Sequence, residues 1–90
     1  MKTRSIRHVR LRGRTLDVRS NGEPAAWFAI SAGGKHPDGV EFAINDESPP
    51  HVLKQGGRFE TTGIPVRVSK IRVRSRRGYA IVNINLRYDE

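Results

Sequence analysis

Arginine and lysine side chains recur at close spacing in two stretches of the sequence, and they are its strongest chemical signal. In each stretch the cations alternate with apolar residues, so in a β-strand they would share one face. Directly opposed like charges destabilise a sheet, so if the two stretches share one sheet, an anionic partner is expected to cover them. Arginine binds phosphates and carboxylates bidentately, which suits a nucleic-acid backbone or an acidic protein surface. The predicted partner-binding residues are Arg7, Arg10, Arg12, Lys70, Arg72, Arg74, Arg76 and Arg77.

Aromatic side chains are the second element of a nucleic-acid surface, because bases stack on them. Trp27 and Tyr79 are the predicted aromatic contacts, with Tyr88 as a further candidate. Base binding requires that Trp27, Tyr79 and the arginines lie on one face of the molecule. The aromatic residues are few, and most of them fall where a core or a sheet edge would need them.

No set of residues has the spacing of a catalytic or metal site. The histidines His8, His36 and His51 are scattered without helical or hairpin ligand spacing, so no metal site is expected. The segments 33–35 and 36–38 are interpreted as turns. A nuclease would need a general base beside the cations, for which only Glu41 or His51 offers itself. The sequence therefore predicts a protein that is not an enzyme and that has no cofactor.

The cations are concentrated at the two ends of the chain. The net charge is +8, and residues 61–88 hold seven cations and no acid, whereas residues 23–60 hold three cations and six acids. This asymmetry favours an acidic or phosphate-bearing partner over a purely solvated surface.

Length and composition predict one small domain spanning residues 1–90. The chain has no cysteine, so disulfides cannot stabilise it. No apolar run follows the basic N-terminus, so neither a signal peptide nor a membrane span is expected, and the protein is predicted to be cytoplasmic.

Period-two alternation predicts an all-β fold. From Ala80 to Tyr88 the even-numbered residues are expected inward, and Ile71 and Val73 supply the inner face of the preceding strand. Ile6 is out of phase with Val9, which predicts a bulge or a late strand start. Turn signals about every ten residues predict an antiparallel sandwich or small barrel of seven to eight short strands with little or no helix.

Two connections are predicted to be hairpins. Ser75–Gly78 is expected to join the last two strands, and Asn21-Gly22 to join the strands at 15–19 and 25–32. A two-residue loop there would place Leu16 opposite Trp27 and leave Phe28 and Ile30 on the outer face. A three-residue loop would place Leu16 opposite Phe28, with Phe28 in the core and Trp27 outside or at an edge, and it is preferred because Pro24 cannot donate a ladder hydrogen bond. The segment 48–55 is interpreted as either one helical turn or an irregular loop.

The alternation of inward-facing residues changes from even to odd positions at Ser69-Lys70, which predicts a bulge or a corner in the strand.

The order of elements from Ala25 to Tyr88 resembles the small β-sandwich structural proteins of tailed-phage virions, including capsid decoration proteins. The resemblance rests on the strand 24–32 (PAAWFAISA), the stretch 39–44 (GVEFAI), the connection 48–50 (SPP), the stretch 53–60 (LKQGGRFE) and the final strands 68–75 and 78–84. The Arg-rich tip at Arg76-Arg77 departs from that pattern.

This resemblance implies a non-enzymatic virion protein that binds a repeating lattice of acidic capsid or other virion proteins, or neighbouring copies of itself. The alternatives are a small basic barrel that binds single-stranded DNA or RNA, and an inhibitor of a host nucleic-acid enzyme. Salt-dependent nucleic-acid binding separates the first alternative from a virion protein.

Overall fold

The strands of this protein pair in a nested order, the first with the last and so on inward. The computed structural model describes residues 2–20, 23–61 and 67–88. The strands are β1 (Lys2–Leu11), β2 (Thr15–Arg19), β3 (Trp27–Lys35), β4 (Val40–Ile44), β5 (His51–Leu53), β6 (Arg58–Glu60), β7 (Lys70–Ser75) and β8 (Tyr79–Tyr88). The nested pairs are β4 with β5, β3 with β6, β2 with β7 and β1 with β8, all antiparallel.

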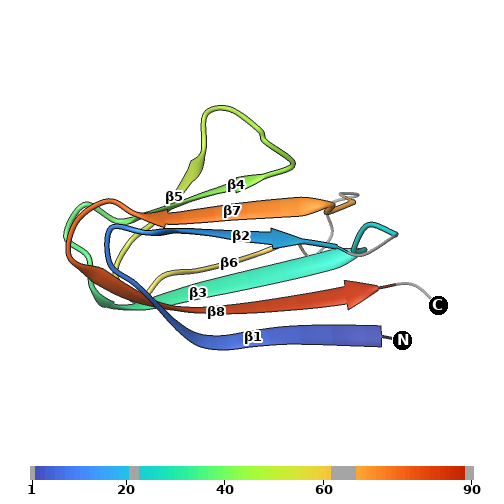
Figure 1. The fold of residues 1–90 in the computed structure, drawn as a ribbon, viewed down its shortest axis with the longest axis horizontal. Coiled ribbons are helices and arrows are strands. Elements are labelled where there is room, and N and C mark those ends of the chain that lie inside the picture. Colours follow the sequence, from blue (N-terminus) through green and yellow to red (C-terminus); the bar gives the residue numbers. More distant parts are fainter. Residues whose placement is uncertain (1, 21–22, 62–66, 89–90) are drawn as a thin grey trace.

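Two further ladders, β3 with β8 and β4 with β7, join these pairs into two sheets. Sheet A has the order β1-β8-β3-β6 and sheet B the order β2-β7-β4-β5. This is the strand order of a jelly roll, a double-sheet form of the predicted all-β sandwich. Figure 1 shows most strands running along the long axis, with most connections at the two ends and the connection between β4 and β5 projecting at the top of the view. The prediction of fold class is confirmed.

Both predicted hairpins are wrong, because the chain crosses between the sheets at these points. β7 lies in sheet B and β8 in sheet A, so the connection 76–78 spans the edge of the sandwich. β2 and β3 are separated in the same way, and Leu16 is opposite Val73 rather than Phe28. Asn21 and Gly22 themselves lie outside the described residues. Alternation fixes which face of a strand is buried, but it does not identify the neighbouring strand.

The two inner faces form one core, as the alternation predicts. Ile71 and Val73 of β7 face Val82, Ile84 and Leu86 of β8 across the sandwich, all at most 2% exposed. Phe28 and Ile30 are buried and Trp27 lies outside, as expected.

An aromatic group fills the centre of this core. The Phe28 and Phe42 ring centroids are 6.1 Å apart, and Phe59 lies 5.0 Å from Phe42. Burial of apolar side chains, these rings among them, is the main stabilising contribution available to a chain of this size.

The bulge predicted near Ile6 is confirmed. The register between β1 and β8 shifts between Ile6 and Val9, so that Arg7 and His8 together oppose Asn83. His8 adopts a positive φ of 54°, and its backbone N–H donates to Asn83 Oδ1 at 3.0 Å. The Asn83 side chain thus replaces a missing ladder partner in the bulge.

The corner predicted at Ser69-Lys70 is also present. Val68 bridges to Ala25, whereas Lys70 already pairs with Arg19 of β2. The backbone N–H groups of Ser69 and Lys70 both donate to Asn45 Oδ1, at 2.8 and 3.2 Å. The helical turn considered for 48–55 does not form, since residues 45–50 are an irregular connection and residues 51–53 are β5.

Candidate functional site

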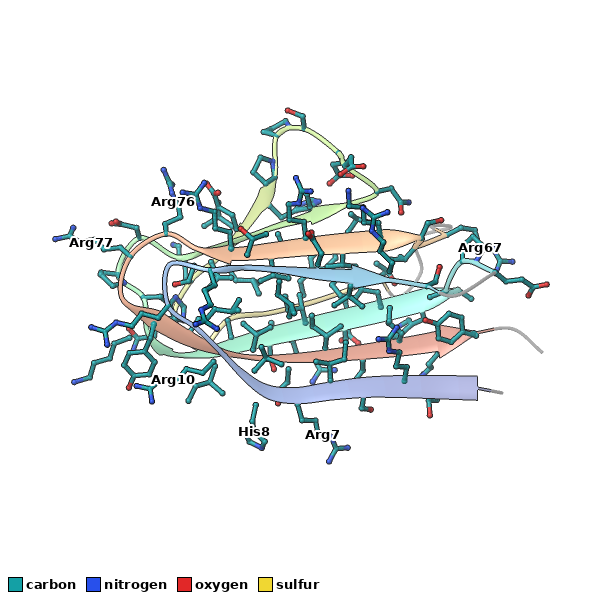
Figure 2. The ribbon with its side chains drawn as sticks, viewed as in Figure 1. Arg7, His8, Arg10, Arg67, Arg76 and Arg77 are labelled. Carbon is teal, nitrogen blue, oxygen red and sulfur yellow. The ribbon has the colours of Figure 1, made fainter. Side chains whose placement is uncertain are left out.

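The predicted cations divide between opposite sides of the sandwich. Arg7 and Arg10 lie on β1 in sheet A, whereas Lys70, Arg72 and Arg74 lie on β7 in sheet B. The two cation-rich stretches therefore do not share a sheet, which the sequence had left open. They form no common ladder of like charges. Arg12, Arg76 and Arg77 lie in the connections 12–14 and 76–78 at one end of the molecule, and Figure 2 shows Arg76 and Arg77 at that end.

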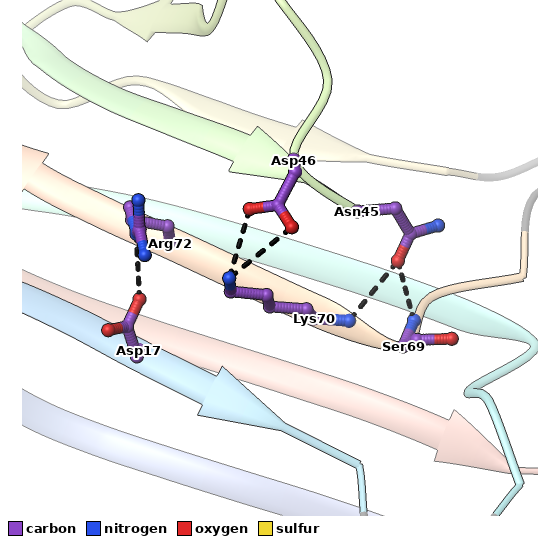
Figure 3. A network of polar contacts seen from close by, with 6 residues as sticks. All are labelled: Asp17, Asn45, Asp46, Ser69, Lys70 and Arg72. Atoms are coloured by element: carbon purple, nitrogen blue, oxygen red, sulfur yellow. Dashed lines mark hydrogen bonds and ion pairs between the residues drawn. The ribbon is translucent and has the colours of Figure 1, made fainter.

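Two of the three β7 cations form ion pairs with acids of neighbouring segments. Lys70 Nζ lies 3.0 Å from Asp46 Oδ1, and Arg72 Nε lies 3.0 Å from Asp17 Oδ1 (Figure 3). The hydrogen bond from Lys70 lowers the pKa of the Asp46 carboxyl, and the hydrogen bond to Asp17 raises the pKa of Arg72. Arg74 is placed directly opposite Glu41 of β4.

The arginines of the connection 76–78 are engaged in the same way. Arg76 Nε lies 3.3 Å from Glu41 Oε1, and Arg77 lies 3.9 Å from Asp38. These exposed ion pairs contribute little to stability, but they reduce the field that an anionic partner would meet on sheet B. These ion pairs could not be predicted from the charge pattern, because the acids come from segments remote in sequence from residues 61–88.

The cations of β1 have no comparable acidic partners. Arg7, Arg10 and Arg12 are exposed, and within the described ranges none of them makes an ion pair. Figure 2 shows Arg7 and His8 projecting beyond the edge strand. Arg4 is different, since its Nη1 donates to the Arg19 carbonyl at 3.0 Å and so links the edge strands of the two sheets. The uncompensated charge therefore lies along β1 and its following connection.

Trp27 and Tyr79 share the outer face of sheet A, and an arginine stacks on each of them. The Arg87 guanidinium carbon lies 4.2 Å from the Trp27 ring centroid. The Arg10 guanidinium carbon lies 4.6 Å from the Tyr79 ring centroid. Cation–π contact makes each pair a positively charged aromatic platform.

The two platforms lie at opposite ends of the ladder between β3 and β8. Trp27 pairs with Arg87, and Tyr79 pairs with Lys35, eight positions away along each strand. At ~3.3 Å per strand residue the platforms are roughly 26 Å apart. The face thus offers an extended track rather than a single point contact.

Uncharged residues occupy the track between the platforms, and Ile81 is the bulky apolar residue among them. Asn83 and Asn85 of β8 and Ser31 and Gly33 of β3 alternate with the buried residues and therefore face outward. Among the described residues of this face the only acid is Glu60, which lies 3.6 Å from Arg58. A polyanion can therefore approach the track without meeting a row of carboxylates.

A hollow of about 330 Å³ opens beside Trp27 on this face. Its wall combines side chains from all four strands of sheet A. They include Thr3, Ser5, Trp27, Arg58, Asn85 and Arg87. The hollow is shallow and polar, which suits a planar group carrying hydrogen-bonding edges.

A second hollow of about 360 Å³ lies at the end that carries the connections 36–39 and 54–57. His36 contributes to its wall and is only 1% exposed. Within the described part of the chain, neither ring nitrogen of His36 has a hydrogen-bond partner, and the same holds for the buried Ser75 Oγ. The sequence predicts a turn at His36 and gives no signal of this burial.

Neither a metal cluster nor a membrane-spanning helix is present in the described ranges. No group of three or more His, Cys, Asp or Glu side chains there is placed to hold a metal ion. No helix in the same ranges is long and apolar enough to cross a bilayer.

Comparison with known proteins finds no matching family model, no matching curated protein and no matching solved structure.

Proposed function

We propose that this protein is a non-enzymatic binding protein that holds single-stranded nucleic acid on the outer face of sheet A. The observation that carries the proposal is the pair of arginine-covered aromatic rings, Trp27 with Arg87 and Tyr79 with Arg10, on one nearly acid-free face. Bases stack on aromatic rings and on guanidinium planes, and arginine also neutralises phosphate. The separation of the platforms suits roughly four nucleotides, at the lower end of single-strand site sizes.

The basic edge supports this assignment. Arg7 and Arg10 lie on β1, the strand that borders the track, and Arg12 follows it directly. A phosphate backbone along this edge would leave its bases to extend over β8 toward β3. Sheet B offers no equivalent, because its central cations Lys70 and Arg72 are already bound by Asp46 and Asp17.

The single tryptophan makes this proposal directly measurable. Trp27 is the only tryptophan in the chain, so selectively excited tryptophan fluorescence reports on this face alone. A single-stranded oligonucleotide is expected to quench it, with an affinity that falls steeply as salt rises. A blunt duplex of the same length is the control, since its bases are not available for stacking and quenching should be weaker. Unchanged fluorescence with the single strand at low salt would contradict the proposal.

A second candidate is a structural component of a virus particle that binds an acidic protein lattice. The strand order of sheets A and B favours it at the level of fold, because viral capsid domains use jelly rolls, although this fold hosts many functions. In that case the basic end with Arg12, Arg76 and Arg77 would contact the lattice. Oligonucleotides would then leave Trp27 fluorescence unchanged, and the protein would co-sediment with assembled particles.

A further inference from the structure

Two arginine-bearing connections lie side by side at one end of the sandwich. β1 pairs with β8 and β2 pairs with β7, so the connections 12–14 and 76–78 cross between the two sheets next to each other. Figure 1 shows both crossings at the left end of the view. Together they carry no acid and four exposed arginines, namely Arg12, Arg14, Arg76 and Arg77.

The end of β3 packs against one of these crossings. Gly78 adopts a φ of 77°, and a Cβ atom at this position would collide with the carbonyl oxygen of Lys35. The Lys35 residue is exposed and lies directly opposite Tyr79 in the ladder between β3 and β8. The basic end, formed by the two connections and Lys35, therefore adjoins the Tyr79 platform.

Acids cover only part of this basic end. The side chains of Arg76 and Arg77 each contact one acid, yet they remain 54% and 72% exposed. Arg12, Arg14 and Lys35 make no ion pair with any residue that the structure describes. Because the crossings span the two sheets, which are about 10 Å apart, the positive charge extends across the thickness of the sandwich.

The basic end offers charge without further stacking platforms. Residues 10–14, 35–41 and 74–78 contain no Phe, Tyr or Trp. A single strand needs such rings for its bases, whereas the bases of a duplex stack on each other and present only phosphates outward. Duplex DNA also carries about one negative charge per ~1.7 Å of its axis, more than a single strand does. Beyond Tyr79 the surface therefore suits a duplex better than it suits more of the single strand.

We propose that the basic end binds the phosphates of a duplex adjoining the single strand, so that the protein recognises a junction between single- and double-stranded nucleic acid. The inference rests on the proposed function, since it presupposes that the single strand occupies the outer face of sheet A. In this arrangement Tyr79 stacks on the unpaired base next to the duplex. The arginines of the two connections neutralise the duplex backbone.

The test uses a DNA hairpin that carries a single-stranded overhang of about six thymidines. It is compared with free oligothymidylate of the overhang length and with the blunt hairpin. Both overhang polarities are measured, and the tighter one is used for the comparison. The overhang hairpin is expected to bind about tenfold more tightly than either part alone, with a steeper dependence on salt, because more phosphates are neutralised. It should quench Trp27, whereas the blunt hairpin should not.

Arg14→Gln combined with Arg77→Gln removes one cation from each connection. This double variant is expected to reduce the preference for the overhang hairpin from about tenfold to about threefold. Its affinity for free oligothymidylate should change by less than about twofold. The matched control combines Arg19→Gln with Arg67→Gln, which removes the same charge at the opposite end, where Figure 2 shows Arg67. The control should keep the tenfold preference.

Three results would overturn junction binding while leaving single-strand binding intact. They are equal affinity for the overhang hairpin and free oligothymidylate, equal affinity for the overhang and blunt hairpins, and the same loss of preference in both double variants. Absence of binding to free oligothymidylate, with no quenching of Trp27 by any of the three DNAs, would overturn the proposed function as well.

Discussion

The guanidinium carbon of Arg87 lies 4.2 Å from the centre of the Trp27 ring, and the two residues are direct partners across β8 and β3. Arg72, on the outer face of the opposite sheet, instead donates from Nε to Asp17 at 3.0 Å. One arginine is thus presented on an aromatic ring and the other is bound by a carboxylate. This difference distinguishes the two faces of the sandwich more clearly than their number of cations does.

Substitution of these two arginines is expected to affect binding unequally. Arg87→Gln removes a cation and the guanidinium group that lies over the Trp27 ring. We expect single-strand affinity to fall about fivefold at low salt. Arg72→Gln removes the same charge from sheet B and should change affinity by less than about twofold, because only long-range attraction is lost. Fluorescence anisotropy with a labelled oligonucleotide measures both. Equal losses would mean that net charge alone drives binding.

The two tyrosines of β8 provide a test of base stacking. Tyr79 lies on the outer face, whereas Tyr88 packs against the core at the other end of the strand. Tyr79→Leu is expected to weaken single-strand binding about tenfold, in the range found when a stacking ring is removed. Tyr88→Leu should reduce the free energy of unfolding but leave the affinity of the folded protein unchanged. A larger effect on binding from Tyr88→Leu would place the contact elsewhere.

The alternation of apolar and polar residues predicted which side chains are buried, but it did not predict which strands are neighbours in a sheet. The inward residues of β7 and β8 and the bulge near Ile6 were predictable because they depend on a period of two within a single strand. The Asn21-Gly22 and Ser75–Gly78 connections were misinterpreted because a short turn between amphipathic strands suits a hairpin and a sheet-to-sheet crossing equally well.

The candidate site was only partly predictable for the same reason. Trp27 and Tyr79 could be named, but their stacking with Arg87 and Arg10 depends on the order of strands in sheet A. The pairing of β7 cations with Asp17 and Asp46 likewise depends on strands that are distant in sequence.

Two buried hydroxyl groups are expected to respond oppositely to removal. Thr61 Oγ1 accepts the Phe28 N–H at 2.9 Å, so Thr61→Val leaves a buried N–H unpaired and should cost about 1–3 kcal/mol. The buried Ser75 Oγ has no partner among the described residues, so Ser75→Ala should leave stability unchanged or raise it by up to about 1 kcal/mol. Urea unfolding of the two variants measures the difference. A destabilised Ser75→Ala protein would show that this hydroxyl has a partner in solution.

The ion pair between Lys70 and Asp46 predicts a pH-dependent contact. The pKa of the Asp46 carboxyl is lowered mainly by the hydrogen bond from Lys70. The pair therefore stabilises the fold above the ordinary pKa of an aspartate, and this contribution is lost as the pH falls through the lowered value. Lys70→Met should raise the pKa of Asp46 toward its ordinary value, whereas Arg74→Met should change it little. NMR titration of the carboxyl carbon in both variants gives the comparison.

Chemical-shift mapping with an unlabelled oligothymidylate tests the central claim most directly, because it locates the bound strand on the protein. On a ¹⁵N-labelled sample, the account predicts the largest shifts at the Trp27 indole N–H, at the Asn83 and Asn85 side-chain amides and along the outer face of β8. Amides of β7 should move little. Dominant shifts around Lys70 and Arg72, or no shifts at saturating oligonucleotide in low salt, would contradict it.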